Sequence, residues 1–143
     1  MVERHRKLAG RQNPWMYTHL VSMRTKQMRD PELQHCIDKC GNCQETCIAT
    51  VAHCLGSGNH AEAQHIRLML DCAEICQTAA NFMLRGSNLH RYVCGTCAEI
   101  CEECARSCEA IAKGDEQMKR CIESCRQCAD VCRKVANVSH RAA

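Results

Sequence analysis

Cysteines at alternating steps of three and four residues fill the positions at which a packed helix normally carries Leu, Ile or Val. Two segments, beginning at Cys36 and at Cys121, have the spacing Cys-x3-Cys-x2-Cys-x3-Cys. A third begins at Cys94 with the spacing Cys-x2-Cys-x3-Cys-x2-Cys-x3-Cys. The positions between the cysteines are mostly polar, as in Asp38-Lys39. The pattern therefore predicts amphipathic helices whose inward-facing stripe consists largely of thiols.

Glycine and capping residues divide the chain into helices. Lys113-Gly114-Asp115, for example, places a cation in a last turn, glycine at the C′ position and an acceptor at the next N-cap. The predicted long helices cover about 31–55, 60–85, 88–113 and 116–136. Their predicted caps are Asp30, Asn59, Ser87 and Asp115. Asn13-Pro14 predicts an additional short helix over residues 14–29.

Four long helices with short connections predict an all-α fold, an antiparallel up-down four-helix bundle with a short additional N-terminal helical segment. No alternating strand pattern competes with this assignment. The expected organisation is a basic N-terminal extension with a short helix (1–30), a cysteine-lined bundle (31–137) and a polar tail (138–143).

Extending each stripe along its helix places all sixteen cysteines at the bundle axis. The candidate metal ligands among them are Cys36, Cys40, Cys43, Cys47, Cys54, Cys72, Cys76, Cys94, Cys97, Cys101, Cys104, Cys108, Cys121, Cys125, Cys128 and Cys132. His65 and Met69 precede Cys72 on the same stripe, and His90 begins the next one, so these three are also candidate ligands. Met83 and Met118 are interpreted as core plugs. The histidines off the stripes are expected in solvent: His5, His19, His35, His53, His60 and His140.

Sixteen cysteines in 143 residues raise the choice between disulfides and metal binding, and cellular compartment decides it. The basic N-terminus is not followed by the apolar segment of an export signal, and no run of 18 apolar residues could span a membrane. We therefore expect a cytoplasmic, reducing location without a membrane partner. There, closely spaced cysteines favour metal binding.

Charge is unevenly distributed along the chain. Residues 1–30 contain seven Lys and Arg against two acidic residues, a net charge of +5, and the remaining residues carry −2. We interpret this segment as a solvated leader and expect no nucleic-acid partner.

Thiols three or four residues apart on a helix have Cβ atoms about 5–6 Å apart, so two thiolates can bracket one small ion. Because a buried anion without compensation is costly, one monovalent ion per thiolate gives a neutral core. Zn²⁺ held by four thiolates would leave two excess negative charges per site, and inward-facing Lys or Arg are missing from the stripes. The pattern thus favours Cu(I), on the order of one ion per cysteine.

Three alternatives remain open at this point: a zinc module, an iron–sulfur module and a disulfide or redox structural protein. Zinc and iron–sulfur cysteines usually lie in knuckles or loops, whereas these lie within helices. The sequence shows no paired inward carboxylates, Ser-His-Asp arrangement or phosphate-binding loop, so we expect no enzyme.

The cysteine stripes on consecutive helices, over about residues 31–136, resemble those of the bacterial copper storage proteins. The lack of an export signal is similar to the cytosolic branch of that family. The resemblance implies storage or sequestration of many Cu(I) ions in the core of a four-helix bundle, commonly assembled as a homo-tetramer. It also implies that copper ions enter at one open end, where His and Met can be ligands, and that another protein donates or accepts them. The second helix departs from the richest members because it contains only Cys72 and Cys76.

Overall fold

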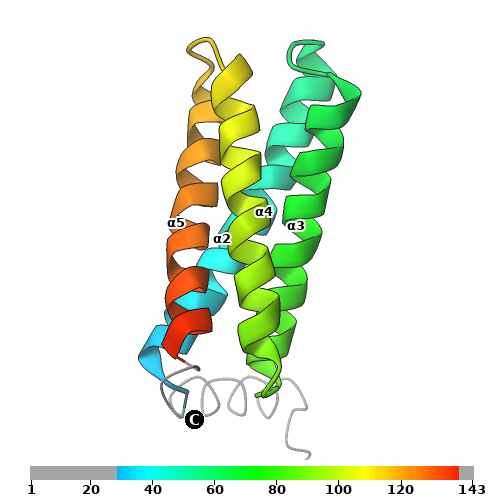
Figure 1. Cartoon of the computed structure of the whole chain (residues 1–143). Helices are drawn as coiled ribbons and strands as arrows, with labels where there is room; N and C mark the ends of the chain where they lie inside the picture. Colours follow the sequence, from blue (N-terminus) through cyan, green and yellow to red (C-terminus); the bar gives the residue numbers. More distant parts are fainter. Residues whose placement is uncertain (1–28, 139–143) are drawn as a thin grey trace, which may run out of the picture. The chain divides into compact units, whose positions relative to one another are not determined.

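The computed structural model describes residues 29–138, and within them it contains helices α2 (Pro31–Ser57), α3 (Ala63–Leu84), α4 (His90–Ile111) and α5 (Glu116–Val138). Consecutive helices run antiparallel, and each packs against two neighbours, so that α2 contacts α3 and α5, and α4 completes the square (Figure 1). The predicted all-α four-helix bundle is confirmed. Residues 14–28 of the helix expected over 14–29, and residues 139–143 of the polar tail, lie outside the described residues.

The core of the bundle is built from small side chains. Cysteines and alanines make up most of the buried set, and the largest fully buried side chains are Met69, Met83 and Met118. Partly buried aliphatic residues such as Ile75 and Ile100 lie around this core. No described helix is long and apolar enough to cross a membrane. Four helices therefore enclose the sulfur-rich interior.

The α4–α5 connection forms as the sequence predicted. Gly114 has a φ of +87°, a left-handed conformation that glycine adopts without strain. Asp115 then caps α5, because its Oδ1 accepts hydrogen bonds from the backbone N–H groups of Gln117 and Met118 at 2.9 and 3.0 Å. The helix α4 ends at Ile111 rather than near 113, since Lys113 already has a positive φ of 43°.

The caps predicted for the two middle helices were wrong. Helix α3 begins at Ala63, after Glu62 rather than Asn59, because positive φ values at Gly58 (71°) and His60 (59°) turn the chain before the helix can start. Helix α4 begins at His90, after Leu89. The Ser87 hydroxyl accepts the N–H of Leu89 at 3.2 Å and so forms a local turn before the helix.

Candidate metal centre

All sixteen cysteines predicted as ligands lie in the core with no exposed surface, and all are free thiols. The stripe geometry explains this placement, because steps of three and four residues return a side chain to the same face of a helix. Neighbouring sulfur atoms lie at hydrogen-bonding distance from one another. Those of Cys40 and Cys132, for example, are 3.5 Å apart. A disulfide would need roughly 2.05 Å. The interior is thus a set of packed, reduced sulfurs contributed by four helices.

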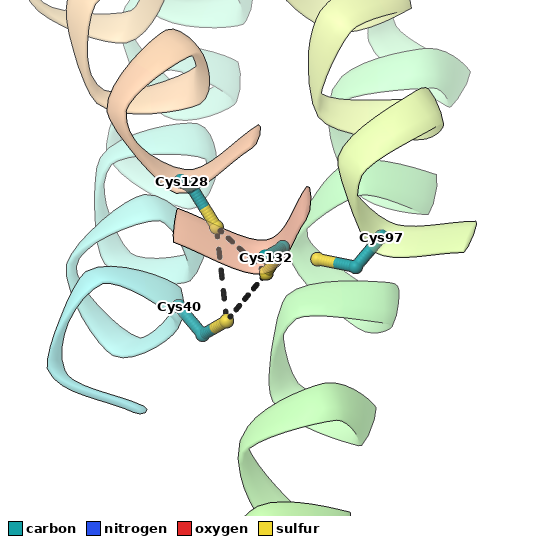
Figure 2. Close-up of side chains that lie close together, drawn as sticks. All are labelled: Cys40, Cys97, Cys128 and Cys132. Atoms are coloured by element: carbon teal, nitrogen blue, oxygen red, sulfur yellow. Dashed lines mark hydrogen bonds between the residues drawn. The ribbon is translucent and has the colours of Figure 1, made fainter. Parts of the chain in front are cut away.

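One group of four sulfurs illustrates the arrangement. Cys40 of α2, Cys97 of α4, and Cys128 and Cys132 of α5 place their Sγ atoms within 4.8 Å of one another (Figure 2). Cys128 lies 3.7 Å from Cys40 and 4.0 Å from Cys132. Two sulfurs that each bind an ion at about 2.3 Å lie about 3.8–4.0 Å apart for tetrahedral or trigonal angles. The spacing therefore suits a metal ion without rearrangement of the helices.

Five of these groups follow one another along the bundle, and we call them together the sulfur column. Each group shares two cysteines with the next. In order, the groups are Cys40/Cys97/Cys128/Cys132, Cys76/Cys97/Cys101/Cys128, Cys43/Cys72/Cys76/Cys101, Cys43/Cys47/Cys72/Cys125 and Cys47/Cys104/Cys121/Cys125. Cys36 extends the column at one end, since its sulfur lies 3.6 Å from that of Cys132. Twelve of the sixteen cysteines belong to these five groups, and their sulfurs form a continuous array.

Electrostatics within the column couple the thiols to one another. Hydrogen bonds with Cys101 and Cys125 lower the pKa of Cys43, because they stabilise its thiolate. Hydrogen bonds with Cys104 and Cys121 raise the pKa of Cys125. The buried residues of the described part include no Lys or Arg that could compensate several thiolates at once. Full ionisation of the column therefore requires cations brought from outside.

The end of the bundle at the α2–α3 and α4–α5 loops combines sulfur with nitrogen. The Sγ of Cys54 lies 3.8 Å from the Sδ of Met118, and Met69 is fully buried. His65 is also buried, and its Nδ1 lies 2.8 Å from the hydroxyl oxygen of Ser107. Its Nε2 is enclosed without a hydrogen-bond partner, and burial lowers the pKa of the ring. A neutral imidazole with an unpartnered nitrogen is therefore available at this end.

His90, the third non-cysteine candidate, lies at the opposite end of α4 and is half-buried. Its Nδ1 is 2.7 Å from the carbonyl oxygen of Ser87, to which it can donate. This contact orients the ring at the start of the helix. A ligand role for His90 stays a prediction.

Sequence reasoning missed three features of the molecule near the bundle end that holds Cys54. Met118 was interpreted as a plug, but its sulfur contacts a cysteine. His53 is exposed, as expected, yet its Nε2 lies 2.8 Å from the Asp115 Oδ2. The expectation that His60 is solvated was wrong, because only 15% of its side chain is exposed and its Nε2 lies 3.9 Å from the same oxygen. These pairs are 55 or more positions apart in sequence, so helical periodicity could not reveal them.

Fold and site together define a class, that of antiparallel four-helix bundles with a thiol-lined core. The chain belongs to the copper storage protein family, whose sequence profile matches residues 29–137. That match covers α2, α3, α4, all but the last residue of α5, and every cysteine of the chain.

Solved structures agree with this membership. The Nmul_A1745 protein of Nitrosospira multiformis is 53% identical, with 77% of this chain and 99% of that one covered and a TM-score of 0.71. Cu(I)-bound copper storage protein BsCsp3 is 31% identical, with 73% and 98% covered and a TM-score of 0.69. A cytosolic copper storage protein from Streptomyces lividans, loaded with five coppers, is 27% identical, with 80% and 97% covered and a TM-score of 0.68.

A further relative is the uncharacterized cysteine-rich protein YhjQ of Bacillus subtilis. It is 35% identical over 66 residues, which make up 46% of this chain. The chain spans 61% of the length of this relative.

Proposed function

We propose that this protein stores Cu(I), with multiple ions bound by the cysteines of the sulfur column. The observation that carries the proposal is the continuity of the column: consecutive four-sulfur groups share two cysteines each, without a buried Lys or Arg among the described residues. One Cu(I) per thiolate leaves the core neutral, whereas divalent ions on the same sulfurs would leave a large buried negative charge. The soft thiolate set also matches the preference of Cu(I).

We assign the sixteen cysteines as the principal ligands, with His65 and Met69 as ligands at the end near Cys54. The unpartnered Nε2 of His65 supports this role. His90 is a further candidate at the opposite end. The expected capacity is on the order of one Cu(I) per cysteine. The bound copper is cargo, and we propose no catalytic cycle.

We also propose a cellular location and partners for the protein. Sixteen free thiols suit a reducing cytoplasm, and the Streptomyces lividans relative is described as cytosolic. We propose that the chain assembles as a homo-tetramer and exchanges copper with a donor or acceptor protein. Light scattering on the purified chain tests the assembly. We assign no function to residues 1–30.

A titration tests the storage proposal. Reduced, metal-free protein is titrated anaerobically with Cu(I) in competition with a Cu(I) chelator of known affinity. Tight uptake of about sixteen ions per chain supports the proposal. Uptake of only a few ions, or displacement of Cu(I) by an equal amount of Zn²⁺, would contradict it. Elemental analysis of protein isolated from cells distinguishes copper from zinc and iron, and a brown colour would indicate an iron–sulfur protein.

A further inference from the structure

Outside the sulfur column, two imidazoles and one carboxylate converge where α2 leads towards α3 and α4 leads into α5. The Nε2 of His53 lies 2.8 Å from the Oδ2 of Asp115, and the Nε2 of His60 lies 3.9 Å from the same oxygen. We call these three residues the His–Asp–His cluster. All three are contributed by different parts of the chain: helix α2, the loop after it, and the cap of α5.

Each member of the cluster is held in place by its backbone surroundings. Asp115 uses Oδ1 for the two N–H groups at the start of α5, which leaves Oδ2 directed to the imidazoles. His53 lies near the end of α2, one residue before Cys54. His60 has a φ of 59°, an uncommon conformation for a residue with a side chain. The backbone therefore holds these three side chains near one another before any ion arrives.

A hydrogen-bonded pair alone does not explain the cluster. The His53–Asp115 contact is an ordinary hydrogen bond, but 3.9 Å is too long for one between His60 and the carboxylate. Donor atoms that bind one ion at about 2.0–2.2 Å lie about 3.0–3.6 Å apart. The two separations bracket this range, so the distance from each imidazole to the carboxylate is compatible with a shared ion.

The surroundings favour a cation that arrives from solvent. The side chains of His53, His60 and Asp115 keep 39%, 15% and 19% of their surface exposed, so an ion can reach them without opening the bundle. Glu62 adds a second carboxylate in this region. Glu62 lines the same pocket as His65 at this end of the bundle. Two carboxylates at this end increase the local concentration of cations.

We propose that His53, His60 and Asp115 form a second metal site, which takes a divalent ion such as Zn²⁺ and is separate from the thiol-lined core. Imidazole and carboxylate are ligands of Zn²⁺ and similar divalent ions, whereas Cu(I) selects the softer sulfurs of the column. Three protein ligands leave one position of a tetrahedral ion to water. The protein thus separates two classes of metal by the hardness of the donors.

The test first fills the cysteines with Cu(I), so that divalent ions cannot bind to them. Full-length protein is first loaded anaerobically with Cu(I) until it takes up no more, and its capacity is recorded. It is then titrated with Co²⁺, followed by absorption, and with Zn²⁺, followed by calorimetry. We expect one divalent ion per chain, with ligand-field bands of Co²⁺ but without the charge-transfer bands of a sulfur ligand. Absence of saturable binding, or the presence of sulfur bands, would overturn the proposal.

Variants identify the ligands. His60→Gln and Asp115→Asn should each weaken Zn²⁺ binding at least tenfold. Asparagine is also a good N-cap, so Asp115→Asn keeps the cap of α5 while it removes the charged ligand. His35→Gln is the matched control, because His35 is an exposed histidine near the other end of α2, and it should bind Zn²⁺ like the unchanged chain. Equal affinity in His60→Gln and the unchanged chain would refute the assignment. The Cu(I) capacity recorded first for each protein tests the storage proposal separately.

Discussion

The Nδ1 of His65 and the hydroxyl oxygen of Ser107 lie 2.8 Å apart, on the facing helices α3 and α4. When Ser107 accepts the Nδ1–H, the ring is fixed in the tautomer whose Nε2 carries a free lone pair. That Nε2 is buried without another partner. Ser107 is thus a positioning residue for His65, in the way that outer partners orient histidine ligands in other metal sites.

Ser107→Ala should weaken the binding of Cu(I) by His65, while the cysteines of the sulfur column still bind their ions. We expect about a tenfold loss of affinity for one ion, because the ring loses the partner that fixes its orientation. The chelator competition described above measures it. Ser124→Ala is the control, since it removes a comparable hydrogen bond, to Asn42, that touches no histidine. Equal losses in both variants would show that Ser107 has only a general structural role.

Replacement of a shared cysteine should cost more capacity than replacement of a terminal one. Cys43 belongs to two four-sulfur groups, whereas Cys54 contacts the thioether of Met118 at the edge of the array. We expect Cys43→Ser to bind about two Cu(I) fewer and Cys54→Ser about one fewer. The buried hydroxyl costs about 1–3 kcal/mol of stability if it lacks a partner. Copper-to-protein ratios after gel filtration distinguish the variants, and identical ratios would argue against a shared array.

Copper uptake should weaken as the pH falls. Each thiol must lose its proton to bind Cu(I), and burial raises the pKa of Cys54, so protons compete with Cu(I) at this thiol. Apparent affinity should decrease by up to about tenfold per pH unit for each proton released. Titrations at two pH values measure this dependence. An affinity independent of pH would mean that thiolates are not the ligands.

Asp115 makes a pH-dependent contribution to folding with a defined sign. The hydrogen bond from His53, followed by that from the backbone of Met118, lowers the pKa of Asp115 from 3.8 to about 2. Because the folded-state pKa is the lower one, the stabilisation is complete above about pH 4 and is lost as the pH falls towards 2. Thermal unfolding across this interval should show a falling Tm, and Asp115→Asn should flatten that part of the curve. An unchanged slope in the variant would contradict this assignment.

The metal-free, reduced chain should already be helical. Hydrogen bonds within the chain hold its caps and turns, as the contacts of Asp115 Oδ1 with the start of α5 show. Cu(I) should then add stability by mass action, about 2.7 kcal/mol for a site at a free concentration one hundred times its dissociation constant. Circular dichroism with and without Cu(I) measures both effects. A random-coil spectrum of the metal-free chain would show instead that copper drives folding.

The sequence predicted the four helices and the residues of their inner faces, because a period near 3.6 residues is a local property. It also predicted the Asp115 cap, whose signal is contained in three adjacent residues. It could not predict which four cysteines form a group, since that depends on the rotation and register of helices far apart in the chain. The late start of α3 and the burial of His60 could not be predicted for a related reason. The positive φ at His60, a non-glycine residue, carries no reliable sequence signal.

The sharing of cysteines between consecutive groups has a consequence for transport inside the bundle. Where two groups have a pair of sulfurs in common, an ion can form a bond to the next group before it releases the last bond to the previous one. Movement along the axis then proceeds by stepwise ligand exchange and needs no water-filled channel. Copper taken up at one end would then reach the far end through an interior that is closed to water. In a partly loaded protein, the ions would move between sites along the axis and would not occupy a fixed set of them.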